Sequence, residues 1–385
     1  MRSTRLRTTN YLAMLLALCL PACVQAATEA ELCARDLEDI AQFMPVNDAG
    51  ASDALARRGA AINDALLKAR GEMPQVSDRA GCDASIYHYL QAWRRGHLWS
   101  QPRDNSTAPS RPAGQPGYVR DPTLRVLSKQ TIVLTLPSFR SEIQAELKAL
   151  LTKERAVLAG HPNWIIDVRR NDGGDDVTYY PLLPWLMDRE FVQNNIELLA
   201  SAANVRAEEG ICAAHPEAKD CAQIVAPRIE ALRRAAPGSF VLADAEPVVY
   251  QPAAKLNLRR PSHVAVLTDR FCGSSCEQFL LTVRQGRAVK LIGRPSDGEL
   301  DFSNLRPHEL PSGQRTLFYA ISRSTRLPVM PVDLNGVQPD ILLPAPADDA
   351  ARVAEVAQAQ RWLEGGSLRP LPAKLEIKAS AGTAP

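Results

Sequence analysis

The sequence predicts an α/β core of buried parallel strands, preceded by a small domain of helices. Short β-branched runs without polar alternation recur after residue 130, as in strands that are covered on both faces. Apolar residues at three-, four- or seven-residue spacing mark helices before and between these runs. The chain has 385 residues, of which 45% are hydrophobic and 23% charged, as in a globular protein of one or two domains.

The charge balance excludes some classes of partner. The 45 Lys and Arg residues nearly match the 43 Asp and Glu residues, so the formal net charge is only +2. A chain this close to neutrality lacks the strong field that draws proteins onto nucleic acids or anionic membranes. We therefore expect no nucleic-acid partner.

Residues 1–26 have the pattern of a secretory signal. Three arginines in the first seven residues precede the apolar run 11–20, and residues 24–26 (VQA) are small where a signal peptidase reads. The run is too short to span a membrane, so we expect no transmembrane segment in the mature chain and a periplasmic or secreted location. Cys23 ends a sequence similar to a lipobox, which leaves a lipid-anchored form open.

Cysteine usage agrees with export. After removal of the signal an even number of cysteines remains, namely Cys33, Cys82, Cys212, Cys221, Cys272 and Cys276. Closeness favours a disulfide between Cys212 and Cys221, and one between Cys33 and Cys82 would join two helices. For Cys272 and Cys276, a disulfide and a reduced, packed pair both stay open. The spacings match no common zinc motif, so we expect no metal.

The mature chain divides at changes of composition and of hydrophobic period. A stretch with five prolines and no aliphatic pattern separates a helical region from the α/β region. In chain order the expected parts are a helical domain 27–100, a Pro-rich linker 101–122, a core 123–346 with a polar helical insertion 186–236, a helix 347–366 and a loose tail 367–385.

The elements follow from the same patterns. In the helical domain the apolar residues recur on one face, for example Cys33, Leu37, Ile40, Ile86, Leu90 and Trp93. Buried-type strands are expected at 132–136, 164–168, 264–268, 289–292 and 317–321. Helices are expected at 143–158, 276–285 and 348–363.

Three turns follow strand ends, where open α/β sheets bind their ligands. Residues 167–174 (DVRRNDGG) end in Gly173 and Gly174, which allow backbone amides to face a ligand. Residues 335–344 (NGVQPDILLP) form a third turn, which a structural role would also explain.

The second turn, 271–277 (FCGSSCE), lies between a strand and a helix. A serine there is close to helix N-terminal amides that can stabilise an oxyanion, so Ser274 is the candidate nucleophile. The alternative is that Ser274 or Ser275 only caps the helix. The oxyanion hole would use the amide of Ser275 and that of Gly173 or Gly174.

Four motifs in order, IIDVRRNDGGD, CGSSCEQF, LIGRPSDG and NGVQPDI, resemble the core of the tail-specific (C-terminal-processing) serine peptidases. The likeness covers roughly residues 125–345. It implies a Clp-protease/crotonase-like ββα core with a small N-terminal helical cap, and it supports Ser274 as the nucleophile. The linker 101–122 is too short for the PDZ module that the processing branch usually carries.

Departures from the family pattern bear on the mechanism. Where the processing branch has a catalytic lysine, this chain has Glu299, and a carboxylate cannot replace a neutral amine without another proton path. A branch similar to the tricorn core and a chlamydial secreted protease uses a histidine and a carboxylate. His97, in RGHL, and Asp333 occupy similar places, so they are the candidate base and its orienting group. The other histidines remain alternatives: His88, His161, His215, His263 and His308.

The resemblance implies an exported serine-type endopeptidase that hydrolyses peptides or unfolded proteins through an acyl-enzyme, without a cofactor. The loss of the lysine and the altered histidine motif leave a second hypothesis open: a non-catalytic ligand- or peptide-binding protein on the same scaffold. A crotonase-like acyl-CoA enzyme would rest on fold analogy alone.

Overall fold

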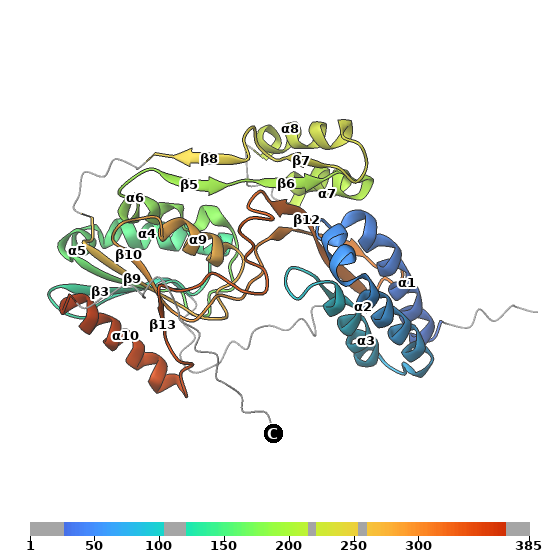
Figure 1. Cartoon of the computed structure of the whole chain (residues 1–385), viewed down its shortest axis with the longest axis horizontal. Helices are drawn as coiled ribbons and strands as arrows, with labels where there is room; N and C mark the ends of the chain where they lie inside the picture. The colour runs from blue at the N-terminus through green and yellow to red at the C-terminus, as the bar shows by residue number, and fades with distance from the viewer. Residues whose placement is uncertain (1–26, 104–120, 215–220, 253–259, 367–385) are drawn as a thin grey trace, which may run out of the picture.

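The computed structural model describes residues 27–103, 121–214, 221–252 and 260–366 (Figure 1). The expected signal 1–26, most of the linker 101–122 and the tail 367–385 lie outside the described residues. Among the helices that are described, none combines the length and the apolar character needed to cross a bilayer.

A six-stranded sheet forms the centre of the α/β core, in the order β13-β10-β9-β4-β3-β2. All neighbours are parallel except β2 and β3. The strands are β2 (Thr123–Val126), β3 (Thr131–Thr135), β4 (Asn163–Asp167), β9 (His263–Thr268), β10 (Val289–Gly293) and β13 (Ile341–Leu342). The four buried strands predicted between residues 132 and 292 are thus confirmed.

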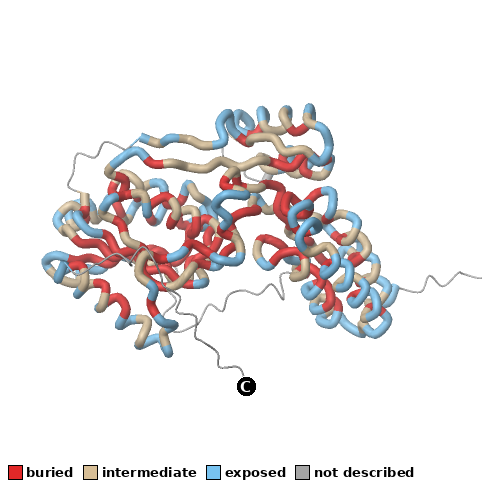
Figure 2. The backbone as a smooth tube through the Cα atoms, viewed as in Figure 1, coloured by how far each residue is buried: buried red, intermediate tan, exposed pale blue. Residues whose placement is uncertain are grey.

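The strands lack polar alternation because both faces of the sheet are covered. In β4, Trp164 and Ile166 belong to the larger core, whereas Ile165 between them packs with Val356 and Ala359 on the opposite face. All five are buried, and Figure 2 shows the buried backbone concentrated along these strands. Each fully buried aliphatic side chain stabilises the fold by about 1.5–3 kcal/mol.

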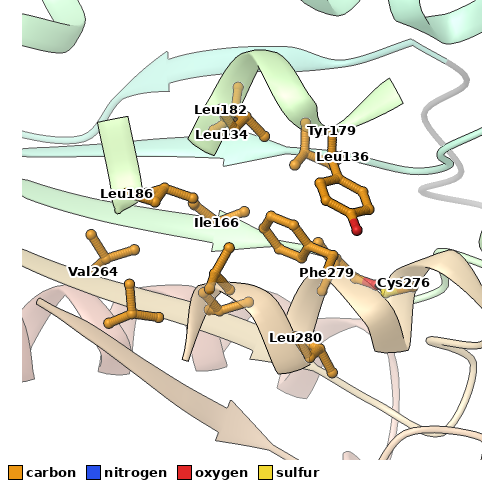
Figure 3. Close-up of a cluster of buried hydrophobic side chains, with 14 of the residues drawn as sticks. Leu134, Leu136, Ile166, Tyr179, Leu182, Leu186, Val264, Cys276, Phe279 and Leu280 are labelled. Carbon is orange, nitrogen blue, oxygen red and sulfur yellow. Dashed lines mark hydrogen bonds between the residues drawn. The ribbon is translucent and has the colours of Figure 1, made fainter. Parts of the chain in front are cut away.

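Helices cover the two faces unequally. The larger core lies under α4 (Gln144–Lys153), α5 (Arg155–Gly160), α6 (Leu183–Leu186) and α9 (Ser275–Val283), and α10 (Asp349–Glu364) covers the other face alone (Figure 1). In Figure 3, the ring of Phe279 from α9 lies between Ile166 of the sheet and Tyr179. The single helix expected at 143–158 is divided into α4 and α5, because the backbone at Glu154 leaves the helical conformation.

A second, antiparallel sheet lies beside the core, with order β1-β12-β6-β7 and β11 paired to β12. Its strands are β1 (Trp99–Pro102), β6 (Ile196–Leu199), β7 (Phe240–Leu242), β11 (Phe302–Glu309) and β12 (Arg315–Ser324). The strand predicted at 317–321 therefore exists but belongs to this sheet, because its alternate residues pack against the N-terminal helices rather than into the parallel core.

The segment 186–236, expected as a helical insertion, also contains strands. Its first two elements are the strands β5 (Phe191–Asn194) and β6. Strand β5 pairs with β8 (Val248–Gln251). Only then do α7 (Ala202–Ala214) and α8 (Cys221–Arg234) follow. Short, half-buried strands such as β5 carry too few apolar residues for the sequence pattern to reveal them.

The N-terminal helices are α1 (Glu29–Asn47), α2 (Ala51–Glu72) and α3 (Arg79–Trp93). They share one core with the second sheet, in which Leu37 and Ile86 pack with Leu317 and Ile321 (Figure 1). The helices are thus one lobe with β12. Four short 3-10 helices complete the fold, at Met73–Gln75, Ser141–Ile143, Asp176–Thr178 and Tyr180–Leu182.

All six cysteines of the described chain are paired. The expected disulfides Cys33–Cys82 and Cys212–Cys221 are confirmed. The question left open at Cys272 and Cys276 is answered by a third disulfide.

Arg315 joins the N-terminal helices to the second sheet. Its fully buried guanidinium lies 2.8 Å from Glu29, 2.6 Å from Asp83 and 3.5 Å from Asp36. Removing one partner of a buried charge cluster leaves the other charges uncompensated.

We expect Arg315→Ala to destabilise the protein by about 3–5 kcal/mol, because three carboxylates lose their shared counter-charge. Arg103→Ala, which removes the solvent-exposed pair with Glu309 next to β1 and β11, should cost no more than about 1 kcal/mol. Urea unfolding of both variants measures the difference. Equal losses would show that the buried cluster adds nothing beyond a surface ion pair.

Candidate active site

The turns of the four sequence motifs lie together at one end of the parallel sheet, where strands β4, β9 and β10 finish. The Gly273 amide donates to the carbonyl of Asn171 (3.2 Å), which joins the first motif to the second. The Asp297 amide donates to the carbonyl of Cys272 (3.0 Å), and the Ser296 amide to that of Val337 (3.3 Å). Backbone hydrogen bonds therefore connect all four turns in a chain.

Ser274 lies directly before helix α9 with its backbone at φ 55° and ψ −123°. A serine that only caps a helix normally has an extended backbone. Positive φ at a non-glycine residue is uncommon, and it occurs where a strand turns sharply into a helix at a nucleophile. The residue is only partly buried, so the conformation favours an accessible nucleophile over a simple cap.

Glu277 holds the serine turn in place from within. Its fully buried carboxylate accepts hydrogen bonds from the Ser274 amide (3.1 Å), the Glu299 amide (2.9 Å), the Gly298 amide (2.8 Å) and the Ser296 hydroxyl (2.5 Å). One side chain thereby fixes the nucleophile turn to the loop 296–299. The sequence analysis named Glu277 only as part of a motif, although its place at the third position of a helix signals a capping role.

Two close contacts restrict the serine turn from outside. The disulfide Cys272–Cys276 closes the five-residue turn around Ser274, with both cysteines fully buried. Gly173, at φ 89°, lies so close that a Cβ there would stand 2.6 Å from the Gly273 carbonyl oxygen and 2.8 Å from the Ser274 Cβ. Only glycine fits at residue 173.

The amides around Ser274 identify the candidate oxyanion hole. The Gly173 amide donates to the Asn171 side chain (2.9 Å), so it is occupied. In the described part of the chain, the amides of Ser275 and Gly174 have no hydrogen-bond partner. Of the two glycines between which the sequence did not choose, Gly174 is the one whose amide is still available to a ligand. Asn171, which the sequence analysis missed, fixes this turn by also donating from its side chain to the Leu136 carbonyl (3.0 Å).

His97 is buried with its backbone at φ 53°. Its Nδ1 lies 2.6 Å from the carbonyl oxygen of Phe302. Because a carbonyl can only accept, Nδ1 carries the proton, and Nε2 keeps its lone pair for use as a base. Burial lowers the pKa of His97 to about 4, and the positive charge of Arg94 contributes a smaller decrease. The ring is therefore neutral at pH 7.

A buried ion pair shapes the turn that carries His97. Arg94 donates to both carboxylate oxygens of Asp48, at 2.7 and 2.8 Å. The same guanidinium donates to the carbonyls of Gly96 (2.8 Å) and His97 (2.9 Å). Nothing in the local sequence pattern reveals this pair, because its two members are 46 residues apart.

In the described residues, no hydrogen bond joins Asp333 to His97. Its carboxylate accepts a hydrogen bond from the Asp301 amide (2.6 Å), while the Asp301 carboxylate accepts from the Asp333 amide (2.9 Å). Burial, reinforced by the neighbouring Asp301, raises the pKa of Asp333 to about 7. The group that orients His97 in this structure is the Phe302 carbonyl, whereas the sequence predicted Asp333. Among the described residues, Ser274, His97 and Asp333 share no hydrogen bond.

Glu299 lies between the two halves of the site. A Cβ on Gly96, beside His97, would stand 2.2 Å from the Glu299 Cβ, and one on Gly273, beside Ser274, would stand 2.2 Å from its Oε1. The two segments are thus separated by one side chain. Burial raises the pKa of Glu299 to about 8, and the carboxylates of Asp297, Glu277, Asp333 and Asp172 add to the effect.

The other histidines have structural surroundings. His308 pairs with Asp39, His161 lies against the Val157 carbonyl, and His263 against Asn163. His88 is exposed, and His215 lies outside the described residues. Within the ranges that the structure describes, no group of three or more His, Cys, Asp or Glu side chains is arranged to hold a metal ion.

Comparison with known proteins assigns the chain to a family. The model of peptidase family S41 matches residues 130–343, which is more than half of the chain. Mature CPAF is similar in fold, with a TM-score of 0.60 and 10% identity over 88% of this chain and 99% of that one. A protein from Parabacteroides merdae assigned as a candidate peptidase gives a TM-score of 0.52 and 13% identity over 86% and 98% of the two chains.

At these identities the solved structures show the fold alone. No curated protein sequence matches this chain. The family match covers strands β3 to β13 of the parallel sheet, the serine turn, the loop 296–299 and the turn at Asp333, whereas His97 lies outside the matched residues. The chain belongs to peptidase family S41.

Proposed function

We propose that this chain is an exported serine endopeptidase that hydrolyses peptides or unfolded proteins through an acyl-enzyme on Ser274. One observation carries the proposal: the accessible Ser274 lies at positive φ at a helix N-terminus, beside the unpartnered amides of Ser275 and Gly174. Export is supported by three disulfides, which persist in oxidising compartments.

In the proposed reaction the Ser274 hydroxyl attacks the peptide carbonyl while Nε2 of His97 accepts its proton. The amides of Ser275 and Gly174 donate to the oxyanion of the tetrahedral intermediate. His97 then protonates the leaving amine, and a water molecule hydrolyses the ester by the same steps. Asp333 is proposed to stabilise the imidazolium that forms during these transfers.

A specific observation favours the second candidate function, a ligand- or peptide-binding protein. In the described residues Ser274 and His97 share no hydrogen bond, and the lysine of the processing branch is replaced by Glu299. A binding protein would retain its ligand after loss of the Ser274 hydroxyl and would hydrolyse nothing.

Ser274→Ala should abolish labelling by a fluorophosphonate probe, because the probe forms a bond with an activated serine oxygen. His97→Gln should reduce hydrolysis of unfolded casein by a factor on the order of 10⁴. Ser262→Ala, at an exposed serine away from the turn, is the control and should label like the wild type. Equal labelling of Ser274→Ala and wild type would end the peptidase proposal.

The double variant Cys272→Ala/Cys276→Ala should lose about a hundredfold in kcat, because a nucleophile displaced by about 1 Å reacts more slowly by that order. The matched control Cys212→Ala/Cys221→Ala removes a disulfide far from Ser274 in the sequence and should retain kcat. Rates on the same peptide mixture measure both. Similar kcat values for the two double variants would show that the turn keeps its geometry without the disulfide.

Glu299→Gln should stabilise the protein at alkaline pH. Since the pKa of Glu299 is about 8 when folded and its ordinary value is 4.5, the folded chain binds the extra proton between these values, and stability falls as pH rises through that window. We expect the melting temperature of the variant to exceed that of wild type at pH 9 but not at pH 5. Glu142→Gln, at an exposed position, should show no such trend. A difference that stays constant with pH would contradict this assignment.

A further inference from the structure

A cleft of about 570 Å³ opens beside the candidate catalytic residues. It is lined by helix α2, by the turn that carries His97 and by the loops around Gly298 and Asp333. Gly96 in its wall directly precedes His97, and Gly298 directly precedes Glu299. Asp333 also lines the cleft, so the cleft adjoins the candidate site, although Ser274 itself is not in its lining.

Arginine is the dominant charged residue of the cleft. Five arginines and three aspartates line it: Arg57, Arg58, Arg94, Arg95, Arg323, Asp53, Asp301 and Asp333. Most of these charges are already compensated within the protein. The pairs are Arg57–Asp53, Arg94–Asp48, Arg323–Glu197 and Arg326–Asp301.

Two guanidinium groups remain without a carboxylate. Arg95 is exposed, and in the described chain it makes no hydrogen bond or ion pair. Arg58 donates only to the backbone carbonyl of Trp93. The backbone at Arg58 leaves the helical conformation within α2, at φ −136° and ψ 18°, and the residue is in the cleft wall. Among the carboxylates that line the cleft, Asp53 and Asp301 have arginine partners, and in the described residues only Asp333 has none.

We propose that Arg95 and Arg58 bind a carboxylate of the substrate peptide and so give the enzyme a preference for acidic sequence near the cleaved bond. This inference rests on the proposed peptidase function. A guanidinium is suited to the role because its donors match the two oxygens of a carboxylate. The carboxylate can belong to an Asp or Glu side chain or to the C-terminus of the peptide, and the experiment distinguishes these sources.

Cleavage profiling tests the proposal without a known substrate. Wild type, Arg95→Gln, Arg58→Gln and the control Arg155→Gln are incubated with a tryptic and a chymotryptic digest of denatured protein, and the cleaved bonds are identified by mass spectrometry. Arg155 is exposed and outside the cleft. We expect Asp and Glu to be enriched at one or two positions around the cleaved bond for wild type and control. Each cleft variant should lose about three- to tenfold of that enrichment.

Peptides with amidated C-termini separate the two carboxylate sources. If the side chain is bound, amidation leaves the acidic enrichment intact. If the C-terminus is bound, cleavage occurs at a fixed distance from the end and is lost on amidation. No acidic or terminal preference in wild type, or a preference that persists in both Arg95→Gln and Arg58→Gln, would overturn the proposal.

A binding measurement keeps the inference separate from catalysis. Ser274→Ala protein is titrated against a fluorescein-labelled nonapeptide of Ala and Ser with one central Glu, and against its Gln analogue. We expect the Glu peptide to bind about three- to tenfold more tightly at low salt, and the difference to shrink at high ionic strength. It should also vanish in Ser274→Ala/Arg95→Gln. Equal affinities of the two peptides at low salt would refute carboxylate binding even if Ser274 proves to be the nucleophile.

Discussion

The buried carboxylate of Glu277 is the interaction on which the site depends. It accepts hydrogen bonds from the serine turn and from three groups of the loop 296–299. Burial raises the pKa of Glu277, and the four donated hydrogen bonds oppose that shift because they favour the ionised carboxylate. That loop in turn binds the last turn, because the Ser296 hydroxyl accepts a hydrogen bond from the Val337 amide (2.6 Å). Glu277 thus reinforces the backbone hydrogen bonds that connect the serine turn, the loop 296–299 and the turn after Asp333.

His97, the other half of the candidate site, belongs to a different lobe from Ser274. His97 follows α3 and is fixed by Arg94, whose partner Asp48 lies at the end of α1. The Phe302 carbonyl that orients His97 belongs to β11 of the antiparallel sheet. The serine turn belongs to the parallel sheet, so the distance between Ser274 and His97 is set by how the two lobes pack. The buried cluster at Arg315 secures the helical side of that packing.

The sequence was most informative where local pattern and buried structure coincide. The apolar run 164–168 predicted β4, since both faces of that strand are covered. The serine turn, its glycines and its cysteines were also predicted, because a strand, a tight turn and a helix follow one another directly. Contacts between distant segments were not predictable: His97 Nδ1 is paired with the Phe302 carbonyl, and a backbone carbonyl carries no sequence signal. The strands β5 and β6 were missed because four-residue strands are too short to show an alternating pattern within a segment that otherwise predicts helix.

Burial is the main cause of the pKa shifts of both His97 and Asp333. In a working pair the imidazolium and the carboxylate stabilise each other's charge, which raises the pKa of the histidine and lowers that of the acid. Here no hydrogen bond joins the two groups, and burial moves the pKa of each toward its neutral form, to about 4 for His97 and about 7 for Asp333. A base is most effective when its pKa is near the operating pH. Contact between the two side chains would therefore shift both groups in the direction that the proposed reaction needs.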